Sequence, residues 1–303
     1  MATNRPDVDR EAIDGALVTR LVAEQFPEWA NLPVRPVALS GWDNRTFHLG
    51  CDKCVRLPSA EVYAEQVTKE QRWLPALAPL LPLPIPVPLA MGVPTEGYPW
   101  PWSVYRWLDG ENASIDRVAN PVEFASTLAG FLVALQHIDP AGGPLPGPHN
   151  FYRGGALTVY EAETRQAIVA LDGRIDTDAA TAVWEAALAA AWHGPPVWFH
   201  GDISWANLLV KDGRLSAVID FGTSGVGDPS GDLAATWTLF AGESRDAFRA
   251  ALQVDEATWA RGRGRTLSKA LFILAKHVNT DPSRATLNGR LIDEILADHR
   301  LAT

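Results

Sequence analysis

Several features are scarce in this chain of 303 residues, and each scarcity narrows the classes of protein to which it can belong. There are only two cysteines, Cys51 and Cys54, which fits a reducing compartment and excludes a fold held together by disulfides. The 26 Lys and Arg residues are outnumbered by 36 Asp and Glu, and no long basic run occurs. A nucleic-acid-binding protein needs a basic face, so we expect no nucleic-acid partner.

Long apolar segments are also missing. The N-terminal residues Met1–Asp14 are polar and acidic, and they lack the pattern of a secretory signal. The most apolar stretch, Leu77–Leu89, is interrupted by prolines before it reaches the length of a transmembrane helix. We therefore expect no membrane partner and a cytoplasmic location.

The residues that are present are typical of a globular protein with a substantial core, since 47% are hydrophobic and 20% are charged. The length allows one large domain or two modest ones. Apolar spacing predicts an α+β fold in which a β-rich part precedes a mostly helical part. Strands are expected within residues 34–57, at 102–107 and around 197–219. Helices are expected at 10–24, 61–77, 122–137, 156–191 with a break near 172–173, 232–248 and 258–301.

Prolines at positions 82, 84, 86 and 88 lie between the second helix and the 102–107 strand. Proline fixes φ and removes an amide donor. We therefore interpret residues 79–94 as an extended, rigid connector.

The segment Phe199–Asp232 carries the most specific pattern. It reads F-H-G-D-I-S-W-A-N-L-L-V, then A-V-I-D-F-G, then G-V-G-D-P-S-G-D. The pattern places Asp202, Asn207 and Asp220 on a strand–loop–strand unit. Each Asp alone is typical of a turn or a helix cap, but the joint order of the three residues is unusual for a solvated turn.

These three side chains match the needs of phosphoryl transfer, which requires positioning, Mg²⁺ and an acceptor for a hydroxyl proton. Asp202 could bond to an acceptor hydroxyl and orient it towards a γ-phosphate. Asn207 and Asp220 offer the oxygen atoms that Mg²⁺ prefers. We predict that Asp202 is the catalytic base and that Asn207 and Asp220 are metal ligands.

The motif H-G-D-x-x-x-x-N with I-D-F-G and G-D-P resembles the aminoglycoside phosphotransferase and choline kinase-like superfamily. The resemblance extends to S-G-W-D-N-R-T-F, V-R-L-P, K-E-Q-R-W and S-V-Y-R-W-L-D-G-E, and so spans nearly the whole chain. It implies a bilobal protein-kinase-like fold that uses ATP and Mg²⁺. Residues 1–105 would form a nucleotide-binding lobe, 106–110 a hinge, and 111–303 a helical lobe that binds the acceptor.

The resemblance also implies roles in the N-terminal lobe. The loop that covers the phosphates would contain Ser40, Gly41, Asn44 and Arg45, although a plain hairpin turn is the alternative. Arg56 would neutralise the α- and β-phosphates, and Glu70 would hold it extended, whereas the alternative is a surface ion pair of little energetic value. The backbone at Arg106 and Leu108 would bind adenine.

Other polar residues are interpreted as structural. Asp232 is expected to cap the following helix, and Asp228 to shape a turn. The alternating segment Arg261–Arg265 is read as a solvated helix start. Trp205 is expected in the core, with a place beside the acceptor as the alternative.

The sequence therefore predicts an ATP- and Mg²⁺-dependent O-phosphotransferase that is a monomer or a homodimer. By resemblance, the leading acceptor is an aminoglycoside-like antibiotic, and the acidic composition weakly favours a cationic molecule. Acidic residues of the helical lobe (Glu161, Glu163 and Asp172) could select such a cation, although a solvated face is the more ordinary interpretation. A macrolide, an amino alcohol or a sugar stays open as the acceptor. A catalytically weak nucleotide-binding regulatory module is the alternative from another class.

Overall fold

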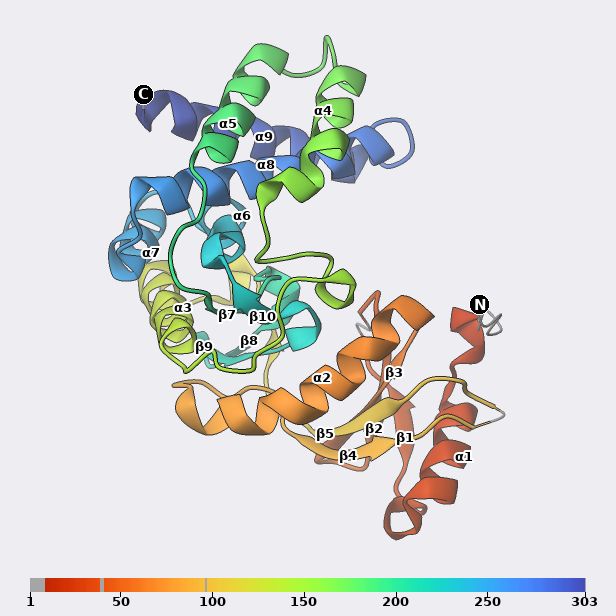
Figure 1. The fold of residues 1–303 in the computed structure, drawn as a ribbon. Helices are drawn as coiled ribbons and strands as arrows, with labels where there is room; N and C mark the ends of the chain where they lie inside the picture. Colours follow the sequence, from red (N-terminus) through yellow and green to blue (C-terminus); the bar gives the residue numbers. More distant parts are fainter. Residues whose placement is uncertain (1–8, 39–40, 96, 303) are drawn as a thin grey trace.

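A computed structural model of the chain describes residues 9–38, 41–95 and 97–302. Figure 1 shows two lobes, a sheet with its flanking helices formed by the first part of the chain and a mostly helical lobe formed by the rest. The predicted α+β class and the bilobal arrangement are confirmed. None of the helices in the described part of the chain combines the length and apolar character needed to cross a bilayer.

The N-terminal lobe is built on one antiparallel sheet with the strand order β1-β2-β3-β5-β4. Its strands are β1 (Val34–Pro36), β2 (Asn44–Leu49), β3 (Lys53–Pro58), β4 (Pro88–Gly92) and β5 (Trp102–Arg106). A short turn joins β2 to β3, and along each strand successive side chains point to opposite faces of the sheet.

Alternation along the strands separates two faces of this sheet. On one face Phe47, Val55 and Val104 form an apolar cluster with helix α1 (Gly15–Gln25). On the other face Arg56 lies opposite Thr46 on β2 and Ser103 on β5, and helix α2 (Glu61–Leu77) packs there. The Arg56 side chain therefore lies on the α2 face of the sheet.

The proline-rich segment 79–94 is more than the connector that the sequence predicts. After a short 3-10 turn it forms β4, which pairs antiparallel with β5 at the edge of the sheet. Pro88 is the first residue of this strand. An edge strand tolerates proline because one of its sides needs no ladder donor.

The C-terminal lobe surrounds one large apolar core. Its helices are α3 (Pro121–Gln136), α4 (Glu161–Ala170), α5 (Thr177–Ala189), α6 (Ala235–Thr238), α7 (Glu243–Leu252), α8 (Glu256–His277) and α9 (Pro282–Ala302). The single helix predicted over 232–248 is wrong: a 3-10 segment at Pro229–Ala234 leads into α6, and α7 is a separate helix. The break falls at Gly242, whose φ of 51° does not continue a right-handed helix.

Short strands embedded in this lobe carry the motif residues. A two-stranded pair joins β7 (Val197–Phe199) to β10 (Gly225–Gly227). A three-stranded sheet has the order β6-β8-β9, formed by β6 (Glu111–Asn112), β8 (Leu208–Lys211) and β9 (Arg214–Val218). The hairpin of β8 and β9 brings Asn207 and Asp220 to the same end of the unit, as the sequence predicts.

The segment Arg261–Arg265 corrects the sequence interpretation. It lies inside α8, where Arg261 and Arg263 are 3% and 4% exposed rather than solvated. The Arg261 Nε atom lies 2.9 Å from an oxygen of buried Asp228, and the Arg263 Nε atom lies 2.8 Å from an oxygen of Asp298. The charges are tolerated in the core because each is paired and hydrogen-bonded.

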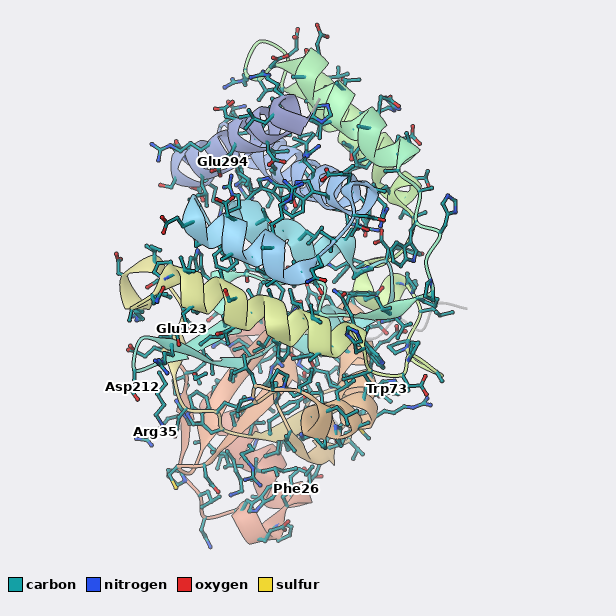
Figure 2. All side chains as sticks on the ribbon, turned by 90° about the vertical axis from the view of Figure 1, so that its left-hand side faces the viewer. Phe26, Arg35, Trp73, Glu123, Asp212 and Glu294 are labelled. Atoms are coloured by element: carbon teal, nitrogen blue, oxygen red, sulfur yellow. The ribbon has the colours of Figure 1, made fainter. Side chains whose placement is uncertain are left out.

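Helix α2 joins the two lobes. The Trp73 ring, labelled where the two lobes meet in Figure 2, packs against the Trp198 ring with their centroids 5.1 Å apart. The Lys69 ammonium donates to the carbonyl oxygens of Gly222 (2.6 Å) and Ser224 (2.9 Å) in the segment after Asp220. Burial lowers the pKa of Lys69 to about 8. These contacts fix α2, and with it Glu70, relative to the motif segment.

Candidate active site

The loop after β7 is held by a buried carboxylate. Asp232 accepts hydrogen bonds from the backbone N–H groups of His200 (2.8 Å) and Gly201 (2.6 Å), so it fastens this loop instead of capping the next helix. Burial raises the pKa of Asp232, against the opposing effect of these donors. The predicted helix cap is therefore wrong, because the Asp232 side chain accepts from residues about 30 positions earlier in the chain and not from the first turn of the following helix.

His200 sets the position of the next residues through both ring nitrogens. Its Nδ1 atom accepts the N–H of Asp202 at 3.2 Å, which leaves Nε2–H to donate to the Ile219 carbonyl at 3.0 Å. Gly201 has a φ of 86°, and a Cβ atom there would lie 2.9 Å from the Thr223 carbonyl oxygen. His200 and Gly201 thus fix the backbone conformation that positions the Asp202 side chain.

Asp202 lies between two cations that the sequence did not indicate. Its Oδ1 atom accepts from Arg153 Nη1 at 2.9 Å and from Lys269 Nζ at 3.0 Å. Burial alone would raise the pKa of Asp202, but Lys269 and Arg153 outweigh it and hold this pKa below the ordinary range. From the residues that the structure describes, its Oδ2 atom accepts one long hydrogen bond, 3.3 Å from the Asn207 amide, and the Asp202 side chain is 30% exposed. Asp202 is thus ionised and able to accept a proton.

Asn207 and Asp220 offer the oxygen atoms that a magnesium site requires. The Asn207 Nδ2 atom donates to the Asp202 carbonyl oxygen at 2.9 Å, which directs its Oδ1 atom away from that bond. The backbone N–H of Ile219 donates to the Asn207 carbonyl at 2.9 Å, so Asp220 is the next residue beside it. The described residues include no group of three or more His, Cys, Asp or Glu side chains able to hold a metal alone. This donor set fits Mg²⁺, which takes one or two protein oxygens and completes its shell with phosphates and water.

Arg56 connects the sheet to Asp220. Its Nη2 atom lies 2.9 Å from an oxygen of Asp220, and its Nη1 atom lies 3.7 Å from an oxygen of buried Glu70. Glu70 also accepts a hydrogen bond from the Tyr105 hydroxyl. Burial alone would lower the pKa of Arg56, but Asp220 and Glu70 outweigh it and raise this pKa. The predicted Arg56–Glu70 pair thus exists, with Glu70 buried and the Arg56 side chain 16% exposed, so it is not a pair on the open surface.

The predicted phosphate loop is placed only in part. Ser40 lies outside the described residues, and Gly41 is exposed. Asn44 is buried at the start of β2 on the same face as Arg56, because it lies opposite Pro58 two residues along β3. Arg45 faces the other way, towards α1, and its Nε atom donates to the Ile13 carbonyl at 3.3 Å. The structure therefore separates the Arg45 side chain from the other predicted nucleotide contacts.

Asp43 also belongs to this loop and comes close to the motif carboxylates. Burial first, then the charges of Asp220 and Asp202, raise the pKa of Asp43 to about 6, against the lowering effect of Arg56 and of a hydrogen bond with Tyr63. The phosphate loop thus brings a third carboxyl group to the site.

The adenine contacts predicted at the backbone of Arg106 and Leu108 stay a prediction, and the structure shows which of these backbone groups are already engaged. Arg106 is exposed, and its N–H donates to the Val87 carbonyl at 3.0 Å, so only its carbonyl is a candidate for adenine. The Leu108 N–H has no hydrogen-bond acceptor among the described residues. A donor and an acceptor two residues apart suit one edge of a purine base.

The structure adds four residues that sequence reasoning did not select: Asp43, Lys69, Arg153 and Lys269. Asp43 and Lys69 stand inside quoted motifs, S-G-W-D-N and K-E-Q-R-W, so their place could have been suspected. Arg153 and Lys269 stand 49 and 67 positions from Asp202, outside any motif.

Comparison with known proteins identifies the family. A sequence profile of the phosphotransferase enzyme family matches residues 34–265, which include every described motif residue above. The chain belongs to the phosphotransferase enzyme family. As a member of this family it is a phosphotransferase, as the sequence predicts. Sequence comparison with curated proteins gives no match.

Solved structures of other phosphotransferases share the fold. The complex of APH(2")-IIIa with GDP and kanamycin is 19% identical, covers 93% of this chain and 98% of its own, and has a TM-score of 0.70. The apoenzyme of macrolide 2'-phosphotransferase MphH from Brachybacterium faecium is 21% identical, with coverages of 92% and 97% and a TM-score of 0.60. Macrolide 2'-phosphotransferase type I is 19% identical, with coverages of 91% and 96% and a TM-score of 0.61.

Proposed function

We propose that this phosphotransferase transfers the γ-phosphate of ATP to a hydroxyl of a small molecule in an Mg²⁺-dependent reaction. The observation that carries the proposal is the linked placement of Asp202, Asn207 and Asp220. The Asn207 side-chain amide donates a hydrogen bond to the Asp202 carbonyl, and the Asn207 backbone carbonyl accepts one from Ile219, the residue before Asp220. A proton acceptor and two oxygen ligands therefore share one rigid unit.

Each residue of the unit has a part in the transfer. The acceptor hydroxyl binds to Asp202 Oδ2 and is oriented in line with the γ-phosphorus. Its oxygen bonds to that phosphorus while the bond to the β,γ-bridging oxygen breaks, the hydroxyl proton passes to Asp202, and ADP leaves. Mg²⁺ bound by Asn207 and Asp220 would neutralise phosphate charge. Arg56 would turn from Asp220 towards the α- and β-phosphates.

The first acceptor class is an aminoglycoside-like antibiotic. Its support is the likeness to structures solved with such molecules, kanamycin in one and gentamicin in another. The acidic composition agrees with a polycationic acceptor. Within the helical lobe, however, Glu161 is occupied by Arg165 at 3.0 Å, and Asp172 is exposed.

A second acceptor class is favoured by a specific observation. The two cations at Asp202 would repel an ammonium group placed next to the reacting hydroxyl. This favours another small hydroxylated molecule over a polyamine. A catalytically weak regulatory module, by contrast, has no use for an intact set of Asp202, Asn207 and Asp220.

The test is a coupled ADP-release assay against aminoglycosides, macrolides, amino alcohols, sugars and hydroxy acids. We expect Mg²⁺-dependent turnover with at least one class. Asp202→Asn is expected to lower kcat by about a thousandfold, because it removes the proton acceptor, while the thermal midpoint and ATP affinity stay near those of the wild type. Asp178→Asn, an exposed change of the same kind on α5, is the control. Full activity in Asp202→Asn would remove this residue from the mechanism.

A further inference from the structure

The cations beside Asp202 form a feature that proton acceptance alone does not require. Arg153 Nη1 and Lys269 Nζ both donate to Asp202 Oδ1, at 2.9 Å and 3.0 Å. A base with one cationic neighbour would already be ionised at neutral pH. The second cation is therefore available to bind a ligand other than the reacting hydroxyl.

The two cations are held from different sides of the helical lobe. Lys269 belongs to α8, whose main packing partners α4, α5 and α9 are helices of that lobe, so its ammonium reaches Asp202 from the helical lobe. Arg153 follows two residues with left-handed backbone, Phe151 and Tyr152, at φ of 55° and 58°. Left-handed conformations cost energy in such residues. The turn is thus a constrained one that points Arg153 at Asp202.

Both cations keep hydrogen-bond donors that Asp202 does not use. An ammonium group has three N–H bonds, and Lys269 has one bond partner within the described residues while its side chain is 59% exposed. For Arg153, all hydrogen bonds to described residues come from Nη1, which leaves Nε and Nη2 to solvent or ligand. Its side chain is 26% exposed. Several free donors thus lie on the Oδ1 side of the base, next to the open Oδ2 atom.

The neighbouring charges on α8 are already paired. Buried Asp228 pairs with Arg261 at 2.9 Å and with Arg265, one turn before Lys269, at 3.7 Å. This carboxylate is therefore not available to neutralise Lys269. Asp43 lies on the nucleotide side, in the phosphate loop. The acceptor side of Asp202 is therefore cationic although the whole chain is acidic.

We propose that the acceptor carries an oxyanion, a carboxylate or a phosphate, next to the hydroxyl that is phosphorylated. Lys269 and Arg153 bind this oxyanion by charge-assisted hydrogen bonds, and Asp202 Oδ2 binds the hydroxyl. The inference rests on the proposed phosphotransfer and names its acceptor class. A polycationic acceptor whose hydroxyl reached Asp202 would have to approach two cations that share a single carboxylate.

Matched probes test the proposal. One pair is 3-hydroxybutyrate and its methyl ester, and the other is glycerol 3-phosphate and glycerol, so each pair differs in the oxyanion alone. Kanamycin is the cationic comparison. Binding is measured calorimetrically on enzyme saturated with Mg·ADP, and turnover is measured as ADP release with Mg·ATP. We expect the anionic member of at least one pair to bind at least tenfold more tightly than its neutral partner. The pair that responds distinguishes carboxylate from phosphate.

Two variants on α8 assign the effect to Lys269. Lys269→Gln should weaken binding of the anionic probe at least tenfold and change binding of the neutral probe by less than threefold. Lys269→Arg, which keeps the positive charge, should retain most of the wild-type affinity for the anionic probe. Lys276→Gln, an exposed change about 10 Å further along the same helix, should leave both affinities unaltered.

Other outcomes overturn the inference. It fails if neither anion binds better than its neutral partner, if Lys269→Gln leaves anion binding unchanged, or if kanamycin binds more tightly than both anions. Failure of the proposed function looks different: ADP release would be missing with all acceptors and Asp202→Asn would change nothing, while the binding measurements would still decide whether Lys269 holds an anion.

Discussion

The two halves of the site use opposite charge arrangements. On the side where we propose that the nucleotide binds, one cation, Arg56, lies between two carboxylates, Glu70 and Asp220. On the acceptor side one carboxylate, Asp202, lies between two cations, Arg153 and Lys269. The first arrangement leaves negative charge available for a metal ion and ends at a guanidinium suited to phosphates. The second leaves positive charge beside the reacting hydroxyl.

The comparison shows that the local arrangement of charge, and not the net charge of −10, decides what each half can bind. An acidic composition suggests a cationic acceptor. The three residues nearest the transferred proton suggest the reverse, because interactions at 3 Å outweigh those of distant, screened charges. Three variants can break or sharpen this contrast.

The largest effect is expected from Asp220→Asn on the nucleotide side. The change removes the carboxylate that would hold Mg²⁺, so we expect kcat/KM to fall by about a thousandfold and the Mg²⁺ concentration for half activity to rise. Asp220 has a φ of 67°, which asparagine also tolerates, so the fold should be kept. The measurement is ADP release across an Mg²⁺ titration at fixed ATP.

Asp212→Asn is the matched control for this variant. Asp212 is exposed, is labelled at the periphery in Figure 2, and also has a left-handed backbone, with a φ of 53°. Its substitution should leave activity and Mg²⁺ dependence unchanged. An unaltered Mg²⁺ titration in Asp220→Asn would exclude this side chain as a metal ligand.

A smaller effect is expected from Arg153→Gln on the acceptor side. Removing one of two cations raises the pKa of Asp202, which those cations now hold low. If ionised Asp202 accepts the proton as proposed, the pH at which activity is lost on acidification should move upwards. We also expect kcat/KM to fall about tenfold. The pH–rate profile is measured with the best acceptor found in the assay.

Arg165→Gln serves as the comparison for Arg153→Gln, since Arg165 forms exposed pairs with Glu161 and Glu185. Exposed pairs contribute little, and this variant should keep the wild-type profile. The contrast between the halves would be lost if the two variants behaved alike.

The smallest effect is expected from Asp43→Asn, which concerns stability. The folded-state pKa of Asp43, about 6, is above its ordinary value of 3.8. Its carboxyl therefore favours folding fully below pH 3.8, and this contribution is lost as pH rises through about 6. Asparagine keeps the hydrogen-bond acceptor for Tyr63 without the charge.

At pH 7 we expect Asp43→Asn to be more stable than the wild type by about 1 kcal/mol, after allowance for solvent screening of a partly exposed group. The advantage should shrink towards pH 4. Thermal unfolding at both pH values checks this, with Asp116→Asn as an exposed control. An equal difference at both pH values would show that charge repulsion is not the cause.

The relative placement of the motif side chains could be predicted from the sequence, whereas the two cations beside Asp202 could not. Asp202, Asn207 and Asp220 fall within 19 consecutive residues, and a hairpin of fixed geometry joins them. Arg56 and Glu70 stand in the strand and helix that follow one another. Local spacing therefore determines where these side chains meet.

Contacts over long sequence separations left no such signal. Arg153 and Lys269 reach Asp202 only because distant segments pack beside the motif loop, and Asp232 likewise acts on residues 31 and 32 positions earlier. The buried arginines of α8 were misread because their pairing depends on the approach of a neighbouring segment. Gly262 permits it: a Cβ atom there would lie 2.8 Å from Leu233 Cβ.

One feature of the nucleotide half extends beyond chemistry at the phosphates. Tyr105 directly precedes the predicted hinge, and its hydroxyl donates a hydrogen bond to Glu70. Glu70 forms an ion pair with Arg56, which forms a second ion pair with Asp220. An unbroken polar chain thus runs from the place expected for the purine to the residue expected to hold the cation. If bound nucleoside changes the affinity for Mg²⁺ by some factor, bound Mg²⁺ must change the affinity for the nucleoside by the same factor. Titrating adenosine with and without Mg²⁺ would measure that reciprocity with no phosphate present.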